Sequence, residues 1–424
     1  MDFITHILYL ARASLDLPLG SVAIGSSLTG GALLNVAFLG LSGVLVVTRR
    51  GSLFPFLVWL PFLTVAGLSV TWAPDKSSAI RLFVLLVTYA GFFAIPFLLN
   101  GNSRRNVSLL KPIIYSSVVP ACYAVAEYVL FPEADGRLKS TFGHPNIFAF
   151  YLTIIIGVIF FLMRSTVAQF TPLFKKIMFL YLGFLFGLVL LTQTRGAWIG
   201  IIIIIAAFAL FVDRRFLFGI VLLPGVLLVP GVADRLSDLN KGTTYSGEMR
   251  SADDTLNSYA WRQVMWEAAM RDSEDARILG KGLASFGPNS VVFFPLANQE
   301  RNYTSKGVGA HSVFVQTLYE TGVVGVACFA FMFLALIVRA WQFRYLDPPG
   351  AIVIISVVVA FAAANASDNV YDYGSAHQYF WGFMGVVFAK WQQMAAEARS
   401  SRADSKITFD AMDQRPRSVL AGRR

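Results

Sequence analysis

The chain has 424 residues, of which 56% are hydrophobic and only 14% are charged. Soluble domains carry about 25% charged residues, so this composition excludes an ordinary soluble protein and indicates a membrane protein with many spans. The net charge of +10 does not point to a nucleic-acid partner, because the basic residues stand at the ends of apolar runs and in the C-terminal segment. Cys122 and Cys328 both lie in apolar segments, so we interpret them as small core residues and not as a disulfide.

Apolar runs separated by polar breaks predict an all-α polytopic membrane protein with about twelve transmembrane helices. The first run is the weakest because Arg12 and Asp16 interrupt it, which leaves eleven spans as the alternative. With ends set to within several residues, the predicted spans are 3–25, 29–48, 52–71, 79–99, 108–131, 146–163, 177–193, 197–212, 216–232, 312–338, 351–366 and 377–390.

The charges of the short loops predict the orientation. If the N-terminus is cytoplasmic, the short loops on its side carry twelve basic residues and those on the other side carry five. Basic residues accumulate in cytoplasmic loops, so both termini are expected in the cytoplasm. The chain then divides into nine helices (1–232), a periplasmic loop containing short helices (233–311), three further helices (312–390) and a basic tail (391–424) whose composition predicts disorder.

The outer loop is far longer than its neighbours, and its residues 233–310 carry nine basic and ten acidic side chains. Because the net charge of the loop is close to zero, a polybasic lipid-binding patch is excluded. Long loops with their own helical pattern are usually functional. A helix is predicted from about Ser258, with Trp261 and Met265 on one face and Arg262 and Trp266 sharing another.

Arg195 stands at the start of an apolar run without charge, residues 196–212, which spans roughly 26 Å as a helix and is followed by Arg214 and Arg215. A lone arginine on the membrane face away from the basic loops, next to the polar residues 192–194, suits an anionic ligand such as a phosphate. Its planar guanidinium donates two parallel hydrogen bonds and stays charged. The alternative is a snorkelling side chain or a salt bridge.

Three further residues have both a functional and a structural interpretation. Arg262 suits an anion only through its setting in the outer loop, and otherwise belongs to a solvated helix face. His311 opens the segment before the tenth span and suits a general base, although a lone histidine is usually structural. Asn146 closes the turn 143–146 before the sixth span, where the alternative to a site residue is a helix cap.

Other chemistry is not indicated. No Asp-x-Asp, His-Glu-x-x-His or Cys/His cluster is present in the sequence, so neither a metal ion nor another cofactor is expected. The glycine-rich stretch 278–287 lacks the Gly-Lys-Ser/Thr ending of a phosphate loop, which argues against a nucleotide site. Asp368, Asp372 and His377 are placed in the last outer loop, where their simplest role is solvation.

Five short motifs follow one another along the chain: the turn 142–146, Thr194-Arg195-Gly196, Arg262 with Trp266, Gly280-Lys281-Gly282 with Phe286, and His311 leading to the stretch 320–325. In this order they resemble the O-antigen ligase and polymerase superfamily of bacterial membrane glycosyltransferases. The resemblance covers residues from about 50 to 390. At one position the chain departs from the family pattern, because Ser312 follows His311 where many relatives carry asparagine.

The resemblance implies a multi-pass enzyme of the bacterial inner membrane, surrounded by membrane lipids, with twelve helices and a large outer loop before the tenth. It implies a glycan donor on undecaprenyl pyrophosphate, a lipid A-core or glycan acceptor, and no metal or cofactor. Arg195 and Arg262 would bind the pyrophosphate, and His311 would be the catalytic base. Ligase and polymerase remain alternatives, as does a transporter or flippase, which would carry broken helices and charges near the midplane. The residues expected to support the site are Asn146, Trp266 and Glu320.

Overall fold

The protein is described here by a computed structural model, which covers residues 2–15, 23–24, 28–49, 51–99, 109–131, 136–167, 170–217, 258–294 and 307–413. Apart from the short antiparallel strands β1 (Ala23–Ile24) and β2 (Leu28–Thr29), every described element is a helix. The predicted all-α class is therefore confirmed for this part of the chain. Most of the predicted span 216–232 lies outside the described residues, as do 233–257 and 295–306 of the outer loop.

Within the described residues, seven helical segments are long and apolar enough to cross a membrane, which confirms a membrane protein but leaves the count of twelve spans a prediction. Two shorter apolar helices, Asn35–Thr48 within α3 (Gly30–Thr48) and α11 (Arg195–Phe211), accompany them. The seven segments are α4 (Phe54–Ser69) with η1 (Val70–Trp72), α5 (Lys76–Leu98), α7 (Leu110–Tyr115) with α8 (Val118–Leu130), α9 (Pro145–Arg164), α10 (Pro172–Leu191), α17 (Val313–Gln342) with η6 (Phe343–Tyr345), and α18 (Pro348–Ser367).

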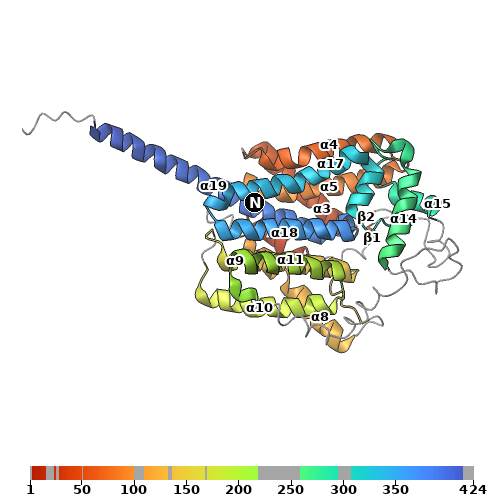
Figure 1. The fold of residues 1–424 in the computed structure, drawn as a ribbon, viewed down its shortest axis with the longest axis horizontal. Helices are drawn as coiled ribbons and strands as arrows, with labels where there is room; N and C mark the ends of the chain where they lie inside the picture. Colours follow the sequence, from red (N-terminus) through yellow and green to blue (C-terminus); the bar gives the residue numbers. More distant parts are fainter. Residues whose placement is uncertain are drawn as a thin grey trace, which may run out of the picture.

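These helices lie side by side, and their termini gather at two opposite ends of the bundle (Figure 1). α14 (Ser258–Asp272) and α15 (Phe286–Phe293) cover one end, which we call the loop end. α19 (Gly374–Asp413) starts at the loop end and leaves the bundle at the other, which we call the tail end. The chain therefore places the starts of α9, α11 and α17 and the finish of α18 at the loop end.

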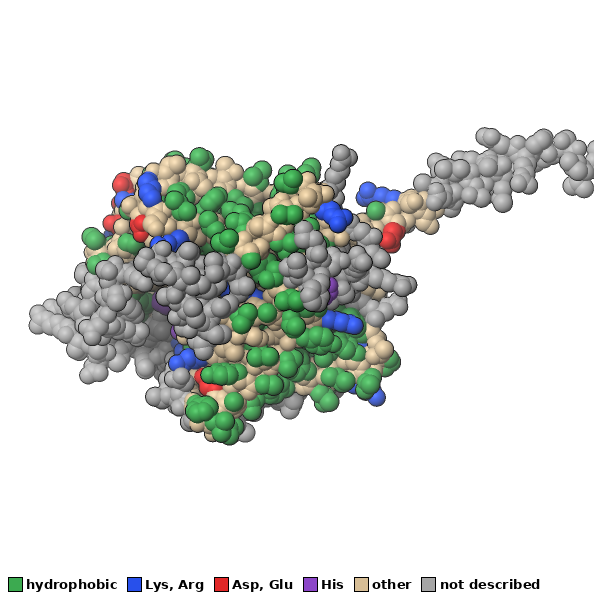
Figure 2. All heavy atoms as spheres, turned by 180° about the vertical axis from the view of Figure 1, so that it is seen from behind, with side chains coloured by type: hydrophobic (Ala, Val, Ile, Leu, Met, Phe, Trp, Pro, Cys, Tyr) green, Lys and Arg blue, Asp and Glu red, His purple; other side chains and the backbone are tan. Residues whose placement is uncertain are grey.

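α9 lies in the core of the bundle, and every side chain from Phe148 to Leu162 is buried. α18 packs against α9, α11 and α17, while α5 packs against α19. Many apolar side chains remain exposed on the sides of the bundle (Figure 2). Exposed apolar sides between polar ends are what helices surrounded by lipid require.

The N-terminal segment differs from the predicted span 3–25. α1 (Asp2–Ala11) ends at Ala11, and the chain turns at residues 12–15. Arg12, the charge that interrupts the apolar run, is buried within the protein at this turn. Because Arg12 is buried against protein, its guanidinium does not face lipid, where a charge is costly.

Two other segments also differ from expectation. α17 is broken at Gly322 (φ 66°, ψ −170°), so the predicted tenth span is not one continuous helix. α19 continues to Asp413, so residues 391–413 are helical where disorder was predicted. This stretch contains five alanines, and alanine is the strongest helix former; the charge of the segment alone did not reveal that preference. Residues 414–424 lie outside the described residues.

Candidate active site

Asp368 is the centre of a polar cluster at the loop end. It follows α18 directly and is only 3% exposed. Its carboxylate accepts hydrogen bonds from the side-chain amide of Asn146 and from the backbone N–H of Asn369 at 2.9 Å. His311 Nδ1 lies 3.4 Å from the same carboxylate. Asp368 therefore ties the start of α9 and the segment before α17 to the end of α18.

His311 is held in an unusual backbone conformation. Its φ is 48°, in the left-handed region, which costs a residue with a side chain about 1–2 kcal/mol. Trp266 fixes the preceding residue, because its indole Nε1 donates to the carbonyl of Ala310 at 2.7 Å. The ring of Trp261 packs edge-on at 6.0 Å from the imidazole. With Nδ1 directed at Asp368 and the side chain 36% exposed, Nε2 is the ring nitrogen that can meet another molecule.

The position after His311, where this chain has Ser312 in place of the asparagine of many relatives, is a helix cap. Ser312 is the N-cap of α17, and its hydroxyl accepts from the backbone N–H of Val315 at 3.4 Å. Asparagine and serine are both favoured N-cap residues. The exchange therefore preserves the start of the helix that follows His311.

Arg262 and Arg195 approach the cluster from two different elements. Arg262 Nη1 donates to the carbonyl of Ser367 at 2.7 Å. Arg195 is the first residue of α11, and a Cβ at the adjacent Gly196 would lie 2.7 Å from the Ser367 hydroxyl. The missing side chain thus lets α11 begin directly against the end of α18, which brings Arg195 near Arg262.

The charges of the cluster influence one another. Burial lowers the pKa of Arg262; the carboxylate of Asp368 opposes this effect and the charge of Arg195 reinforces it. Burial alone would raise the pKa of Asp368, but the hydrogen bond and charge of His311, together with Arg262, hold it below its ordinary value. Burial and the nearby Asp368 raise the pKa of the Tyr373 phenol, so it stays protonated. A second anion entering here would meet two guanidinium groups.

Asn146 and Arg137 link the cluster to the turn before Arg195. Arg137 Nη2 donates to Asn146 Oδ1 at 2.9 Å, and Arg137 Nε donates to the carbonyl of Thr192 at 3.0 Å. The Thr194 hydroxyl donates to the same amide oxygen of Asn146 at 3.1 Å. Hydrogen bonds of Asn146 therefore connect this turn to Asp368.

Sequence reasoning missed two members of this cluster and misplaced a third residue. Asp368 was assigned to solvation, yet it is buried at the centre; a lone carboxylate directly after a long apolar run was the available signal. Arg137 was one of the five basic residues counted in the short loops on the side opposite the N-terminus. His377 is not in a loop but in α19, where its ring stacks on Tyr89 at 4.5 Å.

Glu320 has a different setting from the other predicted site residues. It is 1% exposed, and its Oε1 accepts from the backbone N–H of Phe286 at 3.3 Å and from Gln316 at 3.1 Å. Its carbonyl accepts from the N–H of Gly282 at 2.9 Å. The two glycine motifs, 280–282 and 320–325, thus form a backbone clamp at the break in α17. Glu320 anchors that clamp, and these contacts do not join it to the His311–Asp368 pair.

A cavity of about 420 Å³ opens beside the clamp. The segment Gly307–Gly309, just before His311, lines it together with Arg81, Gln316 and Asp372. Among the described residues, no three His, Cys, Asp or Glu side chains lie close enough to hold a metal ion together. The polar groups that the cluster offers to a ligand are therefore guanidinium and imidazole groups beside one carboxylate.

Comparison with known families bears on this cluster directly. Residues 180–330 match the family model described as Wzy_C, O-antigen ligase. This segment of the chain is similar to the O-antigen ligase family. The match confirms the resemblance drawn from the motifs and supports a membrane enzyme of the O-antigen ligase or polymerase type. Arg195, Arg262 and His311 lie inside the matched segment, whereas Asn146 and Asp368 lie outside it. A search among curated proteins finds no significant match.

Proposed function

We propose that the protein is an O-antigen ligase, which transfers a glycan from undecaprenyl pyrophosphate to a hydroxyl group of lipid A-core. The observation that carries the proposal is the convergence of Arg195 and Arg262 on the His311–Asp368 pair at the loop end. Two cations suit the pyrophosphate of the donor, and the histidine suits the hydroxyl group of the acceptor.

In the proposed reaction, His311 Nε2 takes the proton from the acceptor hydroxyl while Nδ1 stays with Asp368. The acceptor oxygen forms a bond to the anomeric carbon, and the bond from that carbon to the pyrophosphate oxygen breaks. The electron pair leaves with the lipid pyrophosphate. One direct displacement inverts the anomeric configuration.

The arginines stabilise the charge that develops on the leaving group. Arg262 is partly buried and already anchored through Nη1 to Ser367, so its remaining N–H groups are held in place before the reaction. Preorganised donors in a site of low dielectric lower the barrier where charge develops. In this proposal no metal ion is required for that role.

The orientation follows from the same proposal. The loop end would face the periplasm, where the lipid-linked donor is presented, and the tail end would face the cytoplasm. The excess of basic residues in the short loops on the tail side supports this assignment. The cavity beside Gly307–Gly309 gives an acceptor space next to the segment that carries His311.

The same geometry serves a polymerase, which would use the same donor and a glycan repeat unit as acceptor. A transporter or flippase fits less well, because the charged groups that converge in the described chain lie at helix ends and not at the midplane.

The test is transfer by the full-length protein in detergent, where no transport is possible. Donor glycan on undecaprenyl pyrophosphate is mixed with lipid A-core in one arm and with glycan repeat units in another, each with and without a chelator. Transfer to lipid A-core that survives chelation supports the ligase. Transfer only to repeat units assigns the polymerase, and activity that a chelator abolishes and a divalent metal restores contradicts the proposed role of the arginines.

A further inference from the structure

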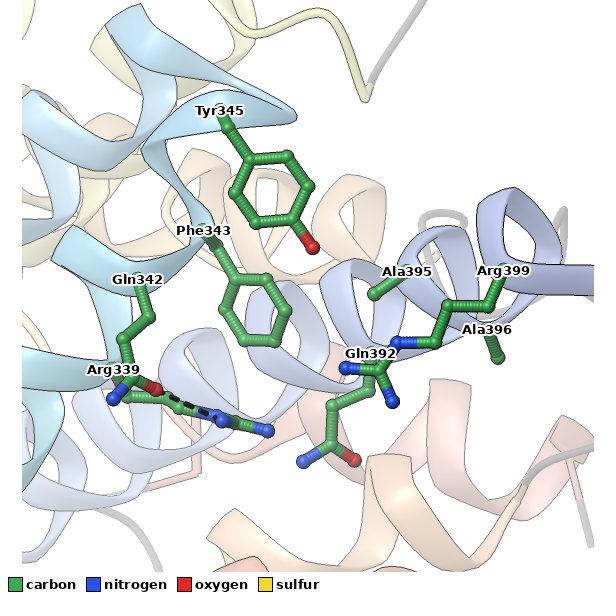
Figure 3. A pocket seen from close by; sticks show the side chains of 8 residues that line it. All are labelled: Arg339, Gln342, Phe343, Tyr345, Gln392, Ala395, Ala396 and Arg399. Carbon is green, nitrogen blue, oxygen red and sulfur yellow. Dashed lines mark hydrogen bonds between the residues drawn. The ribbon is translucent and has the colours of Figure 1, made fainter. Parts of the chain in front are cut away.

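A second charged cavity lies at the tail end, remote from the His311–Asp368 pair. It has a volume of about 280 Å³ and lies between the finish of α17 with η6 and the part of α19 that leaves the bundle. Figure 3 shows the side chains of Arg339 and Arg399 entering the same space from these two elements, with the hydroxyl of Tyr345 directed toward it. Gln342 and Gln392 complete its polar lining.

The helical repeat concentrates these groups on the cavity. Gln392, Ala395, Ala396 and Arg399 follow the i, i+3, i+4, i+7 spacing that defines one face of α19. None of the residues that line the cavity is acidic. By helical periodicity the neighbouring Glu397 lies on a different face of α19, and it does not line the cavity. The lining thus combines cations and amides without a carboxylate.

Arg339 is held in place but incompletely bonded. Its guanidinium lies 4.6 Å from the ring centre of Phe343 and 5.3 Å from that of Phe54. Nη1 donates to Gln342 Oε1 at 3.0 Å, the bond drawn as a dashed line in Figure 3. Nε is buried without a hydrogen-bond partner among the described residues. The aromatic rings and the hydrogen bond to Gln342 hold the Arg339 guanidinium in place at the wall of the cavity.

Arg399 adds a second charge close to the first. The two guanidinium groups interact electrostatically, and neither forms an ion pair with a carboxylate within the described part of the chain. Like charges at short range repel unless an anion lies between them. Paired guanidinium groups are well suited to the oxygen atoms of a phosphate group.

We propose that this cavity binds the phosphate of an anionic phospholipid headgroup. The choice of a lipid over a free anion rests on position: the membrane-spanning segment Val313–Tyr345 ends here, so the cavity lies where headgroups lie. Trp341 and Tyr345 are exposed beside it, as aromatic residues at a membrane interface are. Basic pockets between helices at a membrane surface are suited to such headgroups. The proposal does not depend on the transferase assignment.

The test measures lipid binding to the full-length protein in detergent by native mass spectrometry. The probes are phosphatidylglycerol, phosphatidylcholine and inorganic phosphate. We expect phosphatidylglycerol to bind more tightly than phosphatidylcholine, and Arg399→Gln to weaken it by about tenfold or more, the effect of losing one charged hydrogen bond. Because Arg399 is exposed, this substitution leaves the packed bundle intact.

Arg344→Gln is the matched control. Arg344 lies in η6, near Arg339 in sequence, but its guanidinium packs 4.3 Å from the ring centre of Trp341 and the residue does not line the cavity. We expect it to leave binding unchanged. Equal binding of the two lipids, or an equal loss in Arg344→Gln and Arg399→Gln, would overturn the proposal. Displacement of phosphatidylglycerol by millimolar inorganic phosphate would overturn the assignment to a lipid.

Discussion

Two buried aspartates cap the same helix, α18, and their surroundings differ. Asp347, at the tail end, is 0% exposed, and Asp368, at the loop end, is 3% exposed. Asp347 accepts hydrogen bonds from the hydroxyl of Ser165 at 2.5 Å, the N–H of Thr166 at 3.1 Å and the indole of Trp391 at 3.4 Å. Each of these donors is neutral, and together they join α9 and α19 to the start of α18.

Asp368 is placed against electrostatic preference. A carboxylate is stabilised at the N-terminus of a helix, where Asp347 lies, and destabilised at the C-terminus, where Asp368 lies. Asp368 is retained beside His311 and Arg262, which compensate its charge. The comparison indicates that Asp347 serves the fold and Asp368 serves the site. Burial alone does not distinguish the two roles, but the chemistry of the donors does.

The largest loss of transfer activity is expected from substitution of His311, the partner of Asp368. His311→Ala should reduce transfer by about 10²–10⁴-fold, the usual contribution of a general base, while donor binding stays largely intact. His144→Ala is the control, because His144 is the N-cap of α9, where its Nδ1 accepts from the backbone N–H of Asn146 at 3.1 Å. Partial rescue of His311→Ala by added imidazole would separate a base from a structural residue. Near wild-type transfer in His311→Ala would contradict the assignment.

The next largest loss of transfer activity is expected when the guanidinium group of Arg195 is replaced. Arg195→Lys keeps the charge but loses the planar pair of donors, so transfer should fall by about 10²–10³-fold with normal expression. Arg344→Lys at the tail end makes the same exchange at an exposed position and should leave transfer unchanged. The measurement is the initial rate at saturating donor. An equal loss of transfer in both variants would contradict a specific role for Arg195 at the loop end.

The two aspartates can be compared directly by the same substitution. Asp368→Asn should lower transfer by about 10- to 100-fold, the loss of one charged hydrogen bond, with a small change in thermal stability. Asp347→Asn should instead lower the free energy of unfolding by about 1.5–3 kcal/mol and leave the activity of the folded fraction near normal. Thermal unfolding and transfer, both measured on purified protein, provide the two readings. If the two variants lose the same property, the proposed division of roles is wrong.

The smallest expected effect is the pH dependence of stability. The pKa of Asp368 is lower in the folded protein than its ordinary value of 3.8, so its ionisation stabilises the fold above that pH. This contribution is lost as pH falls below the ordinary value through the folded one, at about 1.4 kcal/mol for each unit of difference. Between about pH 5 and pH 3, across the ordinary pKa of aspartate, the unfolding temperature of Asp368→Asn should therefore fall less than that of the wild-type protein. A parallel fall in both would show that Asp368 is not the group responsible.

Local pattern was enough to locate the helices and three candidate residues. Uncharged apolar runs predicted α9, α11 and α18 close to their observed bounds, because a membrane span is recognised from the hydropathy and charge of its own residues. The same reasoning placed Arg195, Arg262 and His311 outside the apolar runs and on one side of the membrane. It did not show that a break at Gly322 interrupts α17, since a glycine within an apolar run has several possible roles.

The convergence of the site depends on which helix ends are neighbours. Asn146 and Asp368 are 222 residues apart in sequence, and the hydropathy of their two spans carries no information about that contact. The absence of a side chain at Gly196 lets α11 begin against Ser367, and only this packing brings Arg195 to Arg262. Glu320, which the motif order grouped with His311, is drawn instead into the clamp with Phe286 and Gly282. Hydropathy sets the depth of each residue in the membrane, whereas the packing of small and large side chains between helices sets its neighbours.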